Sequence, residues 1–239
     1  MRDLSSLYLE KIVHLNLIKS ILLIFLSILI LSCQNGNENQ TSKPTVNSVE
    51  VEEVEYDSNT DPREAWQKPN LILDKLGDLD NRVVADIGAG TGYFSFRIVP
   101  RAKRVIAIEI NNDLIALMEN LSTSLSDKNK DKFETRLAEP DDPKLGIEEV
   151  DDILIVNVVG YFEDRSAYFR KCHSALRKAG KIHIIDYKIR KLPIEAPDYA
   201  NRVYIHLIEE ELEAAGFTNI ITDDTSLEYQ YIVQATKAL

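Results

Sequence analysis

The sequence is short of glycine and cysteine, and basic residues are outnumbered by acidic ones. Its 239 residues include 9 glycines, whereas average usage of roughly 7 % would give about 17. Two cysteines exclude a framework of several disulfides and a metal site built from several thiolates. Lysine and arginine total 28 against 39 acidic residues. The resulting net charge of −11 argues against a nucleic-acid binder that works by neutralising phosphates.

The remaining composition is that of a globular protein, with 44 % hydrophobic and 28 % charged residues. Near the N-terminus, an apolar run of 13 uncharged residues, Ser20–Ser32, follows Lys19. A transmembrane helix needs about 20 apolar residues, whereas the apolar region of an export signal needs only about 7–15. We therefore expect residues 1–32 to be a signal peptide. The alternative is an uncleaved anchor over Ile12–Leu31, which is disfavoured by the polar residues inside it: His14, Asn16 and Lys19.

The end of this run, Ile30-Leu31-Ser32-Cys33, resembles the lipobox of bacterial lipoproteins, in which the cysteine becomes the lipidated first residue of the mature chain. The resemblance implies lipidation at Cys33, contact with a membrane through that lipid, and a place in a bacterial cell envelope. Residues 34–60 carry six acidic residues against one lysine and lack apolar periodicity. We therefore expect residues 33–60 to be an acidic disordered tether and residues 61–239 to be the folded domain.

In the body of the chain, short β-branched runs alternate with segments of helical periodicity. Five runs predict buried strands: Arg82–Ile87, Arg104–Ile110, Phe133–Ala138, Asp152–Val159 and Lys181–Lys188. Four segments predict helices: Thr91–Val99, Asn111–Ser126 with Leu114, Leu117, Met118 and Leu121 at helical spacing, Asp164–Lys178 closed by Gly180, and Asn201–Ala215 closed by Gly216.

The last two predicted strands, Phe217–Thr222 and Leu227–Gln234, are separated by four residues. A connection that short requires an antiparallel pair, because a parallel crossover needs a dozen residues or more. The sequence therefore predicts an α/β domain with a Rossmann-like, doubly wound sheet of seven strands. The sheet should be mostly parallel, with helices on both faces and an antiparallel β-hairpin at the C-terminal end.

Three of the nine glycines, Gly88, Gly90 and Gly92, follow the first predicted strand. In this layout ligands bind at the carboxyl ends of the strands, and glycines permit tight turning and close approach of backbone to a ligand. Glu109 lies at the end of the second strand, 19 residues after Gly90. Its carboxylate can accept hydrogen bonds from both hydroxyls of a ribose.

Three classes of nucleotide ligand are compatible with a glycine loop, and spacing separates them. A Walker loop requires GxxxxGK[ST], and no lysine follows Gly92. A dinucleotide fingerprint requires GxGxxG, and its third glycine position is occupied by Tyr93, which would crowd a pyrophosphate. The observed GxGxG preceded by Asp86 suits a ligand with an adenosine and an amino acid but no phosphate. Asp86 can meet the ammonium group, and the loop can meet the carboxylate and ribose.

Residues 82–99 and 104–110 resemble motif I and the following acidic strand of class I S-adenosylmethionine-dependent methyltransferases, and the closing hairpin is also typical of them. The resemblance extends over roughly residues 61–239. It is strongest to bacterial members that carry four patterns present here as Arg63–Pro69, Val84–Phe94, Asp141–Leu145 and Glu163–Phe169. It implies S-adenosylmethionine as cofactor and methyl transfer to a small-molecule acceptor, which the sequence leaves unidentified.

By this resemblance, Glu109 would hold the ribose, Glu139 or Asp141 would approach the adenine amino group, and Asn157 would lie beside the methionine part. The implied cofactor-binding set is Asp86, Gly88, Ala89, Gly90, Thr91, Gly92, Glu109, Ile110, Glu139, Asp141 and Asn157. Relatives often carry an acid at the end of the fourth strand, followed by a Tyr-His pair. This chain has Asn157 in place of the acid and no histidine beside Tyr161. The resemblance therefore does not predict histidine-assisted deprotonation of the acceptor, and no catalytic residue is assigned.

Strand-end candidates for a catalytic role are Tyr161, Asp186 and Tyr187, although a residue in such a position is more often a packing or polar strand-end residue. Trp66 either packs the first helix onto the sheet or belongs to a lid. Cys172 lies on the apolar stripe of its helix and is expected to be buried. No metal site is expected, because no ligand spacing relates the histidines of the body: His173, His183 and His206.

Two further functions remain open. The chain could be a non-catalytic S-adenosylmethionine-binding module at the membrane, since this cofactor is made in the cytoplasm and a mature lipoprotein faces away from it. A nicotinamide-dependent oxidoreductase is the weaker alternative. The sequence makes no prediction about oligomeric state.

Overall fold

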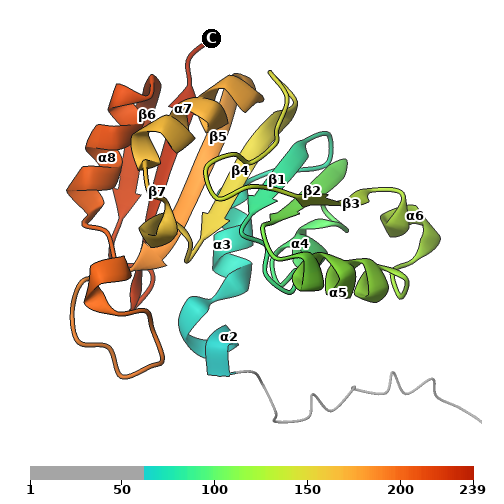
Figure 1. Ribbon diagram of the computed structural model, residues 1–239, viewed down its shortest axis with the longest axis horizontal. Coiled ribbons are helices and arrows are strands. Elements are labelled where there is room, and N and C mark those ends of the chain that lie inside the picture. The colour runs from blue at the N-terminus through green and yellow to red at the C-terminus, as the bar shows by residue number, and fades with distance from the viewer. Residues whose placement is uncertain (1–61) are drawn as a thin grey trace, which may run out of the picture. The chain divides into compact units, whose positions relative to one another are not determined.

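The computed structural model describes residues 62–239, so the expected signal peptide, Cys33 and the acidic tether lie outside the described residues. Seven strands form one sheet in the order β3-β2-β1-β4-β5-β7-β6 (Figure 1). All neighbouring pairs are parallel except those made by β7, which is antiparallel to both β5 and β6. The strands are β1 Val83–Ile87, β2 Arg104–Glu109, β3 Phe133–Leu137, β4 Val150–Val156, β5 Leu176–Tyr187, β6 Phe217–Asp223 and β7 Gln230–Lys237.

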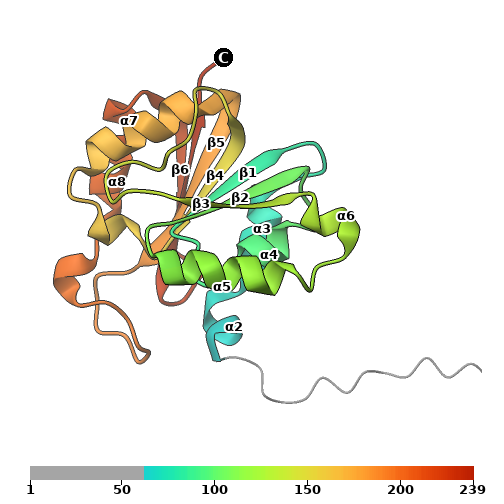
Figure 2. The same cartoon turned by 45° about the vertical axis from the view of Figure 1, so that its right-hand side comes forward.

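Helices cover both faces of the sheet (Figures 1 and 2). On one face, α3 and α4 pack against alternate residues of the central strands, and α5 packs beside them. On the other face, α7 and α8 pack against the intervening residues. The helices are α2 Pro62–Gln67, α3 Pro69–Leu76, α4 Ser95–Ile98, α5 Asn112–Ser122, α6 Asp127–Lys130, α7 Arg165–Ala175 and α8 Ile205–Ala214, and two 3-10 turns are η1 Val159–Tyr161 and η2 Tyr199–Asn201. The predicted doubly wound α/β sheet is confirmed.

Two details of the helix predictions are wrong. The helix that begins after Asp164 ends at Ala175, and β5 starts directly at Leu176. Gly180 therefore does not close the helix; it lies in β5, where a Cβ atom would be 2.7 Å from the carbonyl oxygen of Arg177. In α5, Leu117 and Leu121 are 41 % and 45 % exposed; Met118 is buried, and the other buried residue of the helix is Ile115.

Several predicted boundaries also move. β4 ends at Val156, and the following residues form η1, because Asn157 takes a left-handed φ of 62° that ends the strand. The fourth predicted helix begins at Ile205, after η2. β7 begins at Gln230, so the connection from β6 has six residues, 224–229, yet the pair is antiparallel as predicted.

Helix α2 lies at the carboxyl edge of the sheet, beside the end of β5. The Trp66 ring is 6.0 Å from the ring of Tyr187, which ends β5, and 6.3 Å from Tyr229, which precedes β7. A left-handed Lys68 separates α2 from α3, and Pro69 begins α3 in the position where a missing N–H costs nothing. Within residues 62–239, none of the helices has the length and apolar character needed to cross a bilayer.

Candidate functional site

The glycine loop turns immediately after β1, with its backbone pinned to β2. The amides of Gly88 and Ala89 both donate to the carbonyl of Ile108, at 2.9 and 3.0 Å. Gly88, Gly90 and Gly92 have φ values of 73°, 59° and 83°, a region that favours glycine. A Cβ atom on Gly88 would lie 2.4 Å from the Val158 side chain, whereas one on Gly90 would meet open space. The loop therefore packs tightly at Gly88 and leaves the backbone at Gly90 accessible.

Glu109 ends β2 with its carboxylate held by three backbone amides. Its two oxygens accept hydrogen bonds from Gly90, Ile110 and Asn111 at 3.0, 2.9 and 3.0 Å. The residue is only 8 % exposed. An ionised carboxylate has about four acceptor positions, so these three bonds fix its orientation and leave room for a ligand hydroxyl. The same carboxylate thus ties the glycine loop to β2 and faces the ligand side.

Asp86 lies beneath the loop, 2 % exposed, where the Ser95 hydroxyl donates to it at 2.6 Å. Burial raises the pKa of Asp86 to about 6, although the Ser95 bonds and the positive charge of Arg63 act in the opposite direction. A cation placed near it would favour the charged form. The structure therefore gives Asp86 a partner, Ser95 at the start of α4, that the sequence analysis did not identify.

A cavity of about 230 Å³, the β1–β2 cavity, opens beside this loop. It brings together five of the predicted residues: Gly88, Glu109, Ile110, Glu139 and Asn157. Its other lining residues are Ile87, Ile108, Ala138, Pro140, Val158, Tyr161, Phe162 and Tyr168. Its lining is mostly apolar, and it includes the carboxylate of Glu109 and the amide of Asn157.

The remaining predicted residues do not line this cavity. Asp86, Ala89, Gly90, Thr91 and Gly92 belong to the loop and its support. Asp141 is exposed and directed toward Lys171, with their charged atoms 3.9 Å apart. Of the two acids proposed for the adenine amino group, the structure places Glu139 at the cavity; its carboxylate is 2.9 Å from the Lys144 ammonium.

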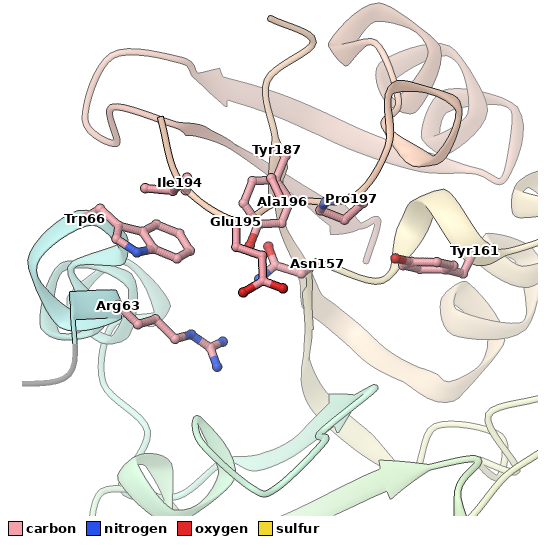
Figure 3. A pocket seen from close by; sticks show the side chains of 9 residues that line it. All are labelled: Arg63, Trp66, Asn157, Tyr161, Tyr187, Ile194, Glu195, Ala196 and Pro197. Atoms are coloured by element: carbon pink, nitrogen blue, oxygen red, sulfur yellow. The ribbon is translucent and has the colours of Figure 1, made fainter. Parts of the chain in front are cut away.

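A larger cavity of about 750 Å³, the aromatic cavity, lies next to the first (Figure 3). Asn157 and Tyr161 line both cavities. α2 supplies Arg63 and Trp66, β5 supplies Tyr187, and the loop after β5 supplies Ile194, Glu195, Ala196 and Pro197. Trp66 is therefore a wall of a cavity as well as a packing residue, which favours the lid interpretation of its segment.

A chain of side-chain hydrogen bonds joins α2 to the boundary between the cavities. Arg63 Nε donates to Gln67 Oε1, Gln67 Nε2 donates to Gln230 Oε1 at 3.2 Å, and Gln230 Nε2 donates to Asn157 Oδ1. Gln67 and Gln230 are fully buried. The chain links the first helix, the start of β7 and the end of β4, which are far apart in sequence.

The loop after β5 is held over the aromatic cavity by one arginine. Arg202 Nε donates to the carbonyl of Pro197 at 2.7 Å, and its Nη1 donates to the carbonyls of Arg190 and Lys188 at 2.8 and 3.4 Å. Where the loop reaches η1, a Cβ atom on Gly160 would lie 1.9 Å from the Asn201 carbonyl oxygen. Glycine at 160 therefore permits η1 and η2 to touch.

The three strand-end candidates differ in their surroundings. Tyr161, 59 % exposed, and the buried Tyr187 line the aromatic cavity. Asp186 lies behind them, 2 % exposed, and accepts from the Tyr187 amide at 2.7 Å. Burial raises the pKa of Asp186 to about 7, against the effects of the Tyr187 and Val159 amides and of Arg202. Its Oδ2 makes no hydrogen bond of standard geometry within residues 62–239.

Two other titratable residues named in the sequence analysis, Cys172 and His183, are buried in the core. Cys172 is buried, as predicted, and burial raises the pKa of its thiol. His183 is buried between Asp152 and Gln234, at 3.2 and 2.9 Å. In the part of the chain that the structure describes, no three His, Cys, Asp or Glu side chains are grouped so that they could hold a metal ion.

Comparison with known proteins agrees with this geometry. Residues 85–182 match the model of a methyltransferase domain family. A tRNA U34 carboxymethyltransferase of Actinobacillus succinogenes is 27 % identical over 185 residues, which are 69 % of this chain and 54 % of that protein. The chain thus spans about half the length of that curated relative.

Solved structures with the same fold include an S-adenosylmethionine-dependent methyltransferase from Aquifex aeolicus. It has a TM-score of 0.66 and 17 % identity, covering 74 % of this chain and 94 % of that one. Phosphoethanolamine N-methyltransferase 2 of Haemonchus contortus, in complex with S-adenosyl-L-methionine, has a TM-score of 0.61 and 13 % identity over 73 % of this chain and 53 % of that one. The described domain therefore has the fold of S-adenosylmethionine-dependent methyltransferases, and part of it, residues 85–182, matches a methyltransferase domain family.

Sequence reasoning missed the residues that join distant segments. Gln67 and Gln230 lie 163 positions apart, and Arg202 reaches loop carbonyls up to 14 positions away. Gln67 does fall within the Arg63–Pro69 pattern, which offered a signal for this segment. Nothing in the local sequence around Gln230 or Arg202 indicates the contacts that each one makes.

Proposed function

We propose that the chain binds S-adenosylmethionine in the β1–β2 cavity and transfers its methyl group to a small molecule in the aromatic cavity. The observation that carries the proposal is the junction of the two cavities, where Asn157 and Tyr161 line both. A donor and an acceptor bound on either side of this junction would meet there. Proximity of this kind supplies about 7–11 kcal/mol toward a bimolecular reaction.

The residues present fit the cofactor. Glu109 is a fixed, buried carboxylate with acceptor capacity left for a ribose hydroxyl. The backbone at Gly90 has open space beside it. Ile110 is 57 % exposed and lines the cavity, where an adenine ring can cover it, and Glu139 lines the same cavity. Asn157 Nδ2 has no hydrogen-bond partner within residues 62–239 and can meet the amino-acid part.

When bound, the cofactor supplies a methyl group already activated by its sulfonium, so the hard chemistry is not the protein's. The protein's own groups bind, orient and exclude water. The loop after β5, fastened by Arg202, covers the acceptor side, and Trp66 and Tyr187 form the wall opposite. A general base is required only for an acceptor that must lose a proton during transfer.

The experiment that tests catalysis incubates the full chain with S-adenosylmethionine and small-molecule fractions of the source cell. Formation of S-adenosylhomocysteine is followed by mass spectrometry. We expect product in large molar excess over protein with at least one fraction, and none with Glu109→Ala. Binding of the cofactor without turnover in any fraction would instead support the non-catalytic module. Binding of NAD with no binding of either sulfur compound would support the oxidoreductase.

Two further parts of the proposal concern partner and place. The relative that acts on tRNA U34 suggests a nucleic-acid acceptor, but the net charge of −11 favours a small molecule. tRNA offered in the same assay would distinguish the two. We also propose that the chain is held at the cell envelope by lipid on Cys33. Membrane fractionation of Cys33→Ala tests this, and a variant that still sediments with membranes would contradict it.

A further inference from the structure

The walls of the aromatic cavity favour a flat, largely apolar ligand. Trp66 and Tyr187 have ring centroids 6.0 Å apart, tilted by 38°, and Tyr161 lies on the side shared with the β1–β2 cavity. Aromatic rings prefer offset or edge contacts with other rings at such separations. With a volume of about 750 Å³, the cavity holds a small molecule of one or two rings.

The chain of side-chain amides fixes what Asn157 presents to this ligand. An arginine can only donate hydrogen bonds, so Gln67 must turn its oxygen toward Arg63 and its NH2 group toward Gln230. Gln230 must then turn its own NH2 group toward Asn157. The oxygen and nitrogen of a side-chain amide are told apart by their hydrogen-bond partners, and here the arginine at the start of the chain determines the orientation of all three amides. Asn157 therefore accepts through Oδ1 and offers the two hydrogens of Nδ2.

The charged residues that line the cavity are one guanidinium, Arg63, and one carboxylate, Glu195. Burial raises the pKa of Tyr187; among the charges around it Arg63 has the largest effect and lowers this pKa, Asp186 raises it, and Arg202 lowers it. Figure 3 shows the Arg63 guanidinium directed into the cavity. The Glu195 side chain is also directed into the cavity from the loop after β5 (Figure 3), but the residue is exposed, so water screens its charge.

We propose that the methyl acceptor is a planar aromatic compound with an anionic oxygen, a carboxylate or phenolate. Its ring would lie against Trp66 and Tyr187, and its charge would be held by Arg63 and Asn157. This rests on the proposed function. An O–CH3 bond forms as the CH3–S bond breaks, and the electron pair of that bond stays on sulfur. The oxyanion and the sulfonium are both neutralised, and no proton is transferred. The reaction therefore needs no histidine near Asn157.

The test is calorimetry on the full chain saturated with S-adenosylhomocysteine. The probes are matched pairs that differ in charge: indole-3-acetate against tryptamine, and 2-naphthoate against 2-naphthylmethylamine. We expect each anion to bind at least tenfold more tightly than its amine. Arg63→Gln should weaken anion binding about 10- to 100-fold, which is the range expected for losing a charge-assisted hydrogen bond. Arg101→Gln, a surface arginine paired with Asp74, is the matched control and should change nothing.

A second variant keeps the proposal testable if Arg63→Gln does not fold. Asn157→Asp tolerates the left-handed φ of 62° and replaces the two donors with a negative charge, so it should reverse the preference toward the amines. Several results would overturn the proposal: equal or tighter binding of the amines, an anion preference that survives Arg63→Gln, or no binding of any probe at millimolar concentration. Failure of S-adenosylhomocysteine to bind would instead overturn the proposed function.

Discussion

Replacing Glu109 with glutamine separates the structural and the ligand-binding roles of this carboxylate. The wild-type side chain accepts from three backbone amides, those of Gly90, Ile110 and Asn111. In the glutamine variant, the side-chain oxygen can still accept from the amides of Ile110 and Asn111. The NH2 group then faces the Gly90 amide, so that two hydrogen-bond donors point at each other. Loss of one hydrogen bond to a charged group in this buried site should lower the free energy of unfolding by about 1–3 kcal/mol.

For a domain of this size, each kcal/mol corresponds to a fall of about 2–4 °C in the melting temperature. The same substitution halves the acceptor capacity offered to the ribose, so affinity for S-adenosylhomocysteine should fall about 10- to 100-fold. Urea unfolding and calorimetry measure the two effects. Glu119→Gln is the control: this exposed α5 carboxylate accepts one hydrogen bond from Thr135 at 3.0 Å and should cost less than about 0.5 kcal/mol. A Glu109→Gln protein with wild-type stability and affinity would refute the reasoning.

Three further predictions follow from the same geometry. Gln230→Met and Gln234→Met each remove a bridging amide from β7, so urea unfolding should show a similar loss of stability for both. Only Gln230→Met should weaken binding of indole-3-acetate. Equal weakening of that binding by the two variants would contradict the role of the amide chain. Burial raises the pKa of Asp186 from 3.8 to about 7. The folded protein therefore binds this proton more tightly than the unfolded chain does, and the free energy of unfolding falls as the pH rises from about 4 to 7. Asp186→Asn should therefore gain stability relative to wild type at pH 8.5 but not at pH 4, by up to about 4 kcal/mol, and a pH-independent difference would be the contrary outcome. Gly160→Ala places a Cβ atom against the Asn201 carbonyl, so it should lose about 1–3 kcal/mol in urea and bind aromatic acids more weakly while keeping its affinity for S-adenosylhomocysteine.

The sheet was predictable because its signals are local. Each central strand is a short β-branched run buried on both faces, and β1 reads as buried throughout Val83–Ile87. The direction of β7 followed from the short connection to β6, even though that connection proved to have six residues. The order of the strands in the sheet, in contrast, depends on which strands pair with each other, and it is seen only in the folded structure.

Errors at element ends have specific physical causes. Gly180 resembles a helix C-cap in sequence, but the helix ends at Ala175 and the left-handed residue is Ala179, with φ of 59°. Leu117 and Leu121 have helical spacing, yet α5 covers only the edge of the sheet, and its buried contacts fall on Ile115 and Met118. Periodicity identifies a helix face but does not tell how much of that face the sheet reaches.

The residues of the β1–β2 cavity were far easier to predict than those of the aromatic cavity. Gly88, Gly90 and Glu109 belong to one strand-loop-strand unit, so spacing alone brings them together. The aromatic cavity assembles residues from α2, β5 and a loop near position 195, and only the fold makes them neighbours. The amide chain through Gln67 and Gln230 is of the same kind, because its contacts from Gln67 to Gln230 and from Gln230 to Asn157 each join residues more than 70 positions apart.

The most direct test of the account is a crystal structure of the full chain with S-adenosylhomocysteine. It should show the ribose hydroxyls at the Glu109 carboxylate, the adenine over Ile110 and the sulfur at the boundary marked by Asn157, facing the aromatic cavity. Density for the ligand elsewhere, or a ribose that does not contact Glu109, would contradict the assignment of the two cavities.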